Sequence, residues 1–231
     1  MDASYSYQDS LHLLNDSEWS KLSIQNRTSV MQSVENEVAR REGRTPCNVS
    51  LFSEPPKDGR IIAGQYNREN RNIEINDYHL RGKSSDCLDT ILHEGRHAYQ
   101  NQAVSSEINH YNKAEVDAWR NNMKPGHYIQ PEENRRAYYR QPIEADAREY
   151  AAIVSGQVIS EQKIQQYSNN KGINSYIEKS AASHKSTESL NKGIQDFRSR
   201  ASQPDEGSAS NAIRAAQSTD PGQSTGSGQG R

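Results

Sequence analysis

The sequence predicts an α+β fold in which a small, mostly antiparallel sheet packs against helices. Three short segments between residues 47 and 76 alternate apolar and polar residues, as half-buried strands do, and at least one hairpin joins them. Apolar residues at helical spacing come before these strands, over 23–42, and after them, over 84–100 and 142–154. A run of strands between helices indicates α+β organisation.

The composition limits how much of the chain can belong to the core. Only 32% of the 231 residues are hydrophobic, and the mean hydropathy is −1.07, whereas globular chains usually reach about 45–50% apolar residues with glycine included. We therefore expect one core domain with appendages. The expected parts are N-terminal helices packed on the core (1–44), the core itself (45–157), peripheral helices (158–201) and a disordered tail rich in Ser, Gly and Gln (202–231).

Charge and hydropathy exclude several kinds of partner. The 28 basic and 30 acidic residues nearly balance, so neither nucleic acid nor an anionic membrane is an expected partner. No apolar run reaches the roughly 18 residues of a membrane span, and the first residues lack the basic and apolar regions of a signal peptide. We expect a cytoplasmic protein, or one secreted into a target cell without a classical signal. Cys47 and Cys87 lack metal or redox spacing and are expected to be reduced and buried.

The elements before residue 80 follow from local patterns. A short helix is expected after Asp16 or Ser17, and a longer one over 23–42 with Gly43 as its stop signal. The expected strands are 47–51, 60–66 and 72–76, and the turn 55–59 separates the first two.

The segment 87–100 contains H-E-x-x-H and reads as a helix that Ser84 or Ser85 caps. Residues advance about 100° each along a helix, so His93 and His97 share one face and Glu94 lies beside both. Two imidazoles and a carboxylate in this arrangement are typical of a zinc site. We expect His93 and His97 to bind Zn²⁺.

A catalytic zinc needs a third protein ligand and an open position for water. Glu144 has the best local argument, because Ala147 and Ala151 give its helix a small face that can approach the motif helix closely. This helix is expected to end near Gly156. Glu115, in a similar Glu-x-Asp-Ala arrangement, is the alternative, followed by a histidine, His110 or His127.

The polar connection 105–141 is long enough to form part of a cleft wall. It contains Tyr138, Tyr139 and His127, which are the candidates for donating a hydrogen bond to the developing oxyanion. Asp89 or Asp146 is a candidate for orienting a ligand imidazole.

Two blocks together resemble a known family. His93-Glu-Gly-Arg-His97-Ala-Tyr-Gln100, followed by Gln141-Pro-Ile-Glu144-Ala-Asp-Ala147-Arg-Glu-Tyr150-Ala151, resembles gluzincin-type metallopeptidases. The second block is similar to the glutamate-ligand helix of ImmA/IrrE-like proteins and of metallopeptidase toxin domains of bacterial polymorphic toxins. The resemblance implies a zincin-like fold, with zinc held by His93, His97 and Glu144 and with Glu94 catalytic. It covers about residues 45–155.

The expected function is hydrolysis of a peptide bond in a protein or peptide substrate, with Glu94 as general base to a zinc-activated water. The interval between the two blocks is longer than in ImmA-like chains, and no helix-turn-helix module is evident, which favours a toxin or effector protease. Such a protein would have an immunity or inhibitor protein, or a secretion-system component, as partner. The alternatives are a non-catalytic zinc-containing binding protein and an ImmA-like regulator that acts on a repressor.

Overall fold

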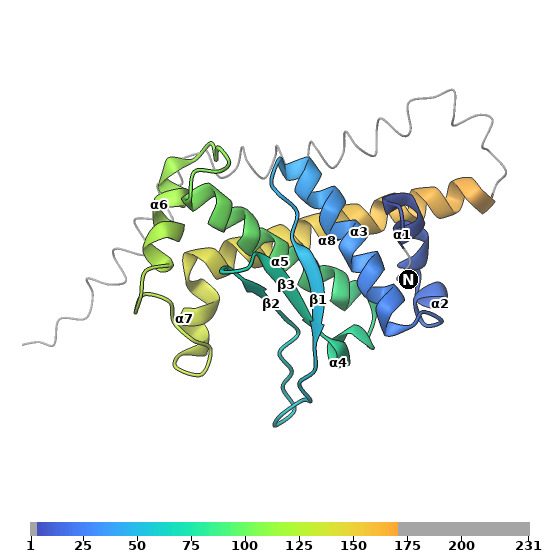
Figure 1. The fold of residues 1–231 in the computed structure, drawn as a ribbon, viewed down its shortest axis with the longest axis horizontal. Helices are drawn as coiled ribbons and strands as arrows, with labels where there is room; N and C mark the ends of the chain where they lie inside the picture. Colours follow the sequence, from blue (N-terminus) through green and yellow to red (C-terminus); the bar gives the residue numbers. More distant parts are fainter. Residues whose placement is uncertain (1–3, 171–231) are drawn as a thin grey trace, which may run out of the picture.

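The computed structural model describes residues 4–170, so most of the expected peripheral helices and the whole expected tail lie outside the described residues. Helices come before and after a small sheet along the chain (Figure 1). In chain order the elements are α1 (Tyr7–Leu13), α2 (Asp16–Trp19), α3 (Ile24–Glu42), β1 (Asn48–Phe52), β2 (Gly64–Asn67), β3 (Asn72–Asn76), α4 (Asp77–Leu80), α5 (Ser84–Val104), α6 (Lys113–Asn122), α7 (Arg135–Arg140) and α8 (Pro142–Asn170).

The three-stranded sheet has the order β1-β3-β2 and is mixed. Strands β2 and β3 form an antiparallel hairpin, but β1 pairs with β3 in parallel, with Val49 opposite Ile73. The expected mostly antiparallel sheet is therefore wrong for one of its two strand pairs. The reason is the segment after β1, which does not close a hairpin; it extends away from the sheet (Figure 1) and returns to the opposite edge.

Asn76 at the end of β3 fixes the two ends of this loop. Its side-chain nitrogen donates to Glu54 O at 2.8 Å and to Ile62 O at 2.9 Å, so the outgoing and returning segments are held to the same strand. Ile61 and Ile62, which were expected within the second strand, precede β2 and are exposed. Consequently β2 is short and forms an edge of the sheet.

Three long helices carry the core. α5 packs along α8, α3 contacts α5 and β1, and β2 and β3 lie on α5 (Figure 1). Val30, Val34 and Val38 of α3 are buried at helical spacing, and Gly43 ends the helix with φ 69°, as expected from the sequence. Cys47 and Cys87 are free and buried, which confirms that prediction.

The ends of α5 and α8 differ from the expectation. Lys83 occupies the cap position of α5 without a side-chain bond, because the Ser84 hydroxyl donates instead to Leu14 O at 2.6 Å. α8 does not end near Gly156 but continues to Asn170. Its apolar face persists at Val158, and Glu161 pairs with Arg41 at 3.0 Å, so contacts with α3 extend the helix past the expected boundary at residue 157.

The segment between α5 and α8 is more structured than its polar sequence indicates. It contains α6 and α7, and α6 contributes Trp119 to a second apolar cluster with Tyr99, Ala103 and Ile143. Among residues 4–170, no helix is both long enough and apolar enough to cross a membrane.

Candidate metal centre

Helix α5 brings the two histidines of the motif together. His93 and His97 lie one turn apart, their rings are perpendicular, and their Nε2 atoms are 3.1 Å from each other. Two nitrogens at this distance are held either by a shared proton or by a cation that both coordinate. The motif helix thus presents two converging lone-pair positions.

Glu144 completes the group from α8. Its Oε2 lies 3.4 Å from His93 Nε2, and its Oε1 lies 3.4 Å from His97 Nε2. The residues that allow this approach are small, since Ala147 and Ala151 are fully buried in the contact of α8 with the rest of the core. The structure therefore places the expected third residue beside both imidazoles.

These three side chains could hold a metal ion. Glu144 is only 2% exposed, and its Oε2 has no hydrogen-bond partner among residues 4–168, which is costly for a buried carboxylate oxygen. Ligand atoms about 2.0–2.1 Å from a tetrahedral ion lie about 3.3–3.4 Å from one another. The separation of 3.1 Å between the imidazole nitrogens and the two of 3.4 Å, each to a different oxygen of Glu144, are close to that spacing.

The ionisable groups of the site shift one another's pKa values. Burial raises the pKa of Glu144, but the adjacent His93 and His97 imidazoles outweigh burial and hold it well below the usual range. Burial lowers the pKa of His97, but the hydrogen bond to Glu144 and the charges of Glu94 and Glu144 raise it to about 9. Without a metal, this negative environment favours a proton on His97; a divalent cation would serve the same purpose.

Glu94 occupies a different position from Glu144. It lines the same cavity of about 290 Å³ as the two histidines, but nothing in the described part of the chain bonds or pairs with its carboxylate. Edge strand β2 forms another wall of this cavity through Gly64, Gln65 and Tyr66. An unpaired carboxylate therefore faces the space between the three-residue group and a free strand edge.

Two tyrosines from the segment between α5 and α8 also line the cavity. The Tyr128 hydroxyl donates to Glu144 Oε1 at 2.9 Å, and its ring meets the Tyr138 ring edge to face at 6.2 Å. Burial raises the pKa of both phenols, and the charge of Glu144 raises it further, so both stay protonated and can donate. Tyr128 was missed by the sequence analysis; it adjoins His127, but only tertiary contacts set its role.

A buried network of ion pairs contacts the side of α5 that faces the core. Arg96 pairs with Asp146 at 2.8 Å and with Glu42 at 3.4 Å, and Arg44 joins Glu42 to Glu35 at 2.7 and 2.6 Å. The Arg96 guanidinium also lies over the rings of Tyr99, Tyr150 and Trp119. The Gly-Arg pair inside H-E-G-R-H thus faces the core, whereas the histidines and Glu94 face the cavity.

Glu115 and His110 lie apart from the three-residue group. His110 Nε2 is 2.7 Å from Glu115 and its Nδ1 is 2.9 Å from the Tyr99 hydroxyl, so the two residues satisfy each other beside Trp119. Neither belongs to the group that could hold a metal. The alternative ligands therefore have another role in the structure.

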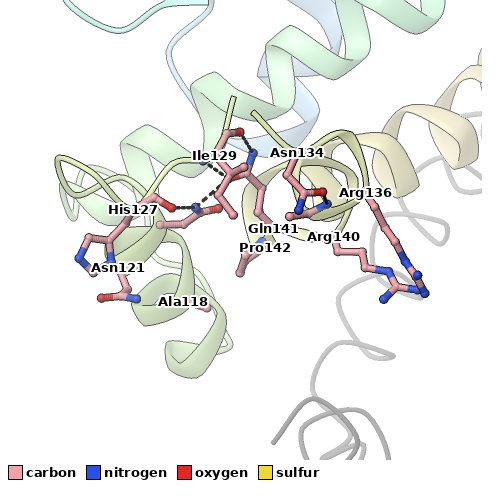
Figure 2. Close-up of a pocket in the computed structure, with 11 residues that line it drawn as sticks. Ala118, Asn121, His127, Ile129, Asn134, Arg136, Arg140, Gln141 and Pro142 are labelled. Atoms are coloured by element: carbon pink, nitrogen blue, oxygen red, sulfur yellow. Dashed lines mark hydrogen bonds between the residues drawn. The ribbon is translucent and has the colours of Figure 1, made fainter. Parts of the chain in front are cut away.

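His127 and Tyr139 do not line the cavity. His127 is exposed and lines a separate, open pocket between α6 and α7, whose α7 side carries Arg136 and Arg140 (Figure 2). There its carbonyl accepts from the Asn122 amide at 3.2 Å. Tyr139 is 43% exposed and stacks on Arg148. Of the three oxyanion candidates, only Tyr138 lines the cavity with the histidines.

The two aspartates that were candidates for orienting an imidazole lie in different environments. Asp146 touches neither imidazole; it binds Arg96 and the Gln100 amide, and Gln100 Oε1 in turn lies 2.9 Å from His97 Nδ1. Asp89 lies one turn before His93 and is exposed; burial raises its pKa, which the charge of His93 partly offsets. Gln100 was not singled out from the sequence, although it follows His97 by three residues and so lies on the same face of the helix.

Comparisons with known proteins add no assignment. No protein-family model, curated protein or solved structure matches this chain.

Proposed function

We propose that this chain is a zinc-dependent metallopeptidase of the gluzincin type with a zincin-like fold. The observation that carries the proposal is the convergence of His93 Nε2, His97 Nε2 and the Glu144 carboxylate at 3.1, 3.4 and 3.4 Å, with an unpaired Glu94 lining the same cavity. Two imidazoles and one carboxylate are the ligand set of catalytic zinc sites that keep one position open.

Zinc held by His93, His97 and Glu144 would activate a water molecule and polarise the scissile carbonyl. Glu94 is the general base: its carboxylate takes a proton as the water oxygen attacks the carbonyl carbon. It then delivers that proton to the amine nitrogen when the C–N bond breaks. Glu144 is unsuited to this step, because Tyr128 and both imidazoles already contact its oxygens.

The substrate in this proposal is an extended peptide. It adds to the free edge of β2, where backbone hydrogen bonds hold it without demanding a particular sequence. Gly64 and Tyr66 on this strand line the cavity, so a peptide paired there passes the histidines and Glu94. Tyr138 supplies the oxyanion hydrogen bond, since its phenol lines the cavity and stays protonated through burial and the charge of Glu144.

The test compares proteolysis by matched variants loaded with zinc. Glu94→Gln should keep one zinc per chain and lose about 10²–10⁴-fold of its activity, because only the proton transfer is removed. Glu149→Gln, an exposed glutamate on α8, is the control and should stay fully active. New N-termini in a cell lysate, identified by mass spectrometry, give the readout; equal product patterns for wild type and Glu94→Gln would refute the assignment.

The family resemblance extends the proposal to a bacterial toxin or effector protease. Expression of the wild-type chain inside a target cell should then arrest growth, whereas Glu94→Gln and Glu144→Gln should be harmless. A repressor-directed regulator predicts instead a single cleaved protein and normal growth, and a non-catalytic zinc protein predicts no difference between wild type and Glu94→Gln.

A further inference from the structure

Gln100 makes contacts with both halves of the candidate metal centre. This side chain is fully buried. Its Oε1 lies 2.9 Å from His97 Nδ1, and its Nε2 donates to Ile143 O at 2.9 Å and to Asp146 Oδ2 at 2.6 Å. Ile143 directly precedes Glu144, so one amide joins a histidine on α5 to the helix turn that carries the glutamate.

The orientation of this amide is determined by its neighbours. A flipped amide would direct its oxygen at two acceptors, the Ile143 carbonyl and the Asp146 carboxylate, and would lose both bonds. Asp146 is fixed in turn by two bonds from Arg96, at 2.8 and 3.0 Å, and aromatic rings surround that guanidinium. The Gln100 oxygen therefore faces His97 as an acceptor.

An acceptor at this place determines the tautomer of His97. Nδ1 must carry the ring proton that the Gln100 oxygen accepts, so in the neutral ring Nε2 has the lone pair. Nε2 is the atom that faces His93 and Glu144. The same contact also restricts rotation of the ring, because Nδ1 is held 2.9 Å from a side chain that cannot turn.

We propose that Gln100 is the positioning residue of the metal centre: it selects the His97 tautomer that coordinates through Nε2 and holds the turn of α8 that presents Glu144. Asp146 and Arg96 act through it by fixing the amide. This inference rests on the proposed function for the identity of the metal, but it concerns residues that neither the motif nor the proposed chemistry requires.

Gln102 offers a matched control on the same helix. It is also a buried glutamine whose amide bridges to another segment, accepting from Thr45 N at 3.0 Å and donating to Thr45 O at 3.1 Å. It contacts no residue of the metal group. Gln100→Met and Gln102→Met therefore each remove one buried, backbone-bonded amide, and only the first removes the contact with His97.

The first readout is zinc affinity, measured by competition with a chelator. Gln100→Met should bind zinc about 10–100-fold more weakly than wild type, the usual effect of losing a partner of a ligand histidine, while Gln102→Met should stay within about threefold. Gln100→Asn, which keeps a polar group but is one methylene too short to bridge, should show the same loss and serves if Gln100→Met does not fold.

The second readout is the His97 ring proton in NMR spectra of the zinc-loaded protein. Wild type and Gln102→Met should show an Nδ1–H resonance protected from exchange, and both Gln100 variants should lack that protection. Unchanged zinc affinity in the Gln100 variants, or an equal loss in Gln102→Met, would overturn the positioning role and leave the proposed function intact. A wild-type chain that takes up no zinc would overturn both.

Discussion

Gly64 of β2 lies directly against the side chain of Glu94 on α5. A Cβ atom at position 64 would be 3.5 Å from Glu94 Cγ, 3.2 Å from Glu74 O and 2.8 Å from Thr90 Cγ2. The last distance is too short for two carbon atoms, so with any larger residue at position 64 either the Thr90 side chain or the edge strand must shift. The spacing between the proposed peptide-binding edge and the proposed general base thus depends on a missing side chain.

Gly64→Ala should therefore destabilise the protein by about 1–3 kcal/mol, the usual cost of overpacking, as measured by denaturant unfolding. It should also lower kcat/KM for peptide hydrolysis without changing the zinc content. Thr90→Ser removes the clashing methyl and keeps the hydroxyl that donates to Asp86 O. The double variant should recover most of both losses; a failure to recover would mean that contact with Thr90 is not the cause.

Gly95 is required for a different reason, because the buried ion network covers it. A Cβ there would lie 2.8 Å from Arg44 Nη2 and 3.0 Å from Glu35 Oε2, and both groups are fixed in their pair. Gly95→Ala should destabilise by about 1–3 kcal/mol despite alanine's better helix propensity. In α8, a Cβ added at Gly156 would have no atom of residues 4–170 within 4 Å apart from its own helix backbone, so Gly156→Ala should instead stabilise the protein by up to about 1 kcal/mol. In thermal unfolding, the Tm of Gly95→Ala should therefore fall below that of the wild type, and the Tm of Gly156→Ala should rise above it.

Substitutions of the two cavity tyrosines should have different effects on zinc binding and on kcat. Tyr128→Phe removes the hydrogen bond to Glu144 and should weaken zinc binding by roughly 1 kcal/mol, about fivefold. Tyr138→Phe should weaken zinc binding less than Tyr128→Phe does and lower kcat about 10²–10³-fold, as loss of one oxyanion donor does. Tyr139→Phe, on the exposed side of the same helix, should change neither. If Tyr139→Phe rather than Tyr138→Phe lowered kcat, the oxyanion assignment would be wrong.

Zinc binding should strengthen as pH rises. The pKa of His97 in the metal-free protein is about 9, so zinc must displace a proton at neutral pH, and affinity should increase about tenfold per pH unit up to roughly pH 9. The stability of the metal-free protein should instead fall as pH rises. A folded-state pKa above the unfolded value of 6.5 stabilises the fold below pH 6.5, and this contribution is lost as pH rises through 9. Chelator competition and thermal unfolding across pH 6–9.5 measure the two trends.

The sequence was sufficient for the parts of the site that local geometry determines. His93 and His97 share a face because any helix places residues four apart together, and the small residues Ala147 and Ala151 indicated where α8 approaches. The pattern favoured Glu144 but left Glu115 as an alternative, because each has an acidic, alanine-containing helical context.

What the sequence could not supply depends on tertiary contacts. The parallel pairing of β1 with β3 follows from the path of the loop that Asn76 holds at both ends. Helix α8 continues past Gly156 because Glu161 forms an ion pair with Arg41 and accepts a hydrogen bond from the Tyr7 hydroxyl. Tyr128 and Gln100 gain their roles only from where Glu144 and His97 lie, so no local spacing identifies them.

The position of the bound metal is the sharpest test of the proposed zinc site. Crystals of the zinc-loaded protein, measured on both sides of the zinc absorption edge, should show one anomalous peak per chain. We expect that peak between His93 Nε2, His97 Nε2 and the Glu144 carboxylate, with Glu94 outside coordination distance. A peak at His110 and Glu115, direct coordination by Glu94, or a crystal soaked with zinc that shows no peak at α5 would contradict it.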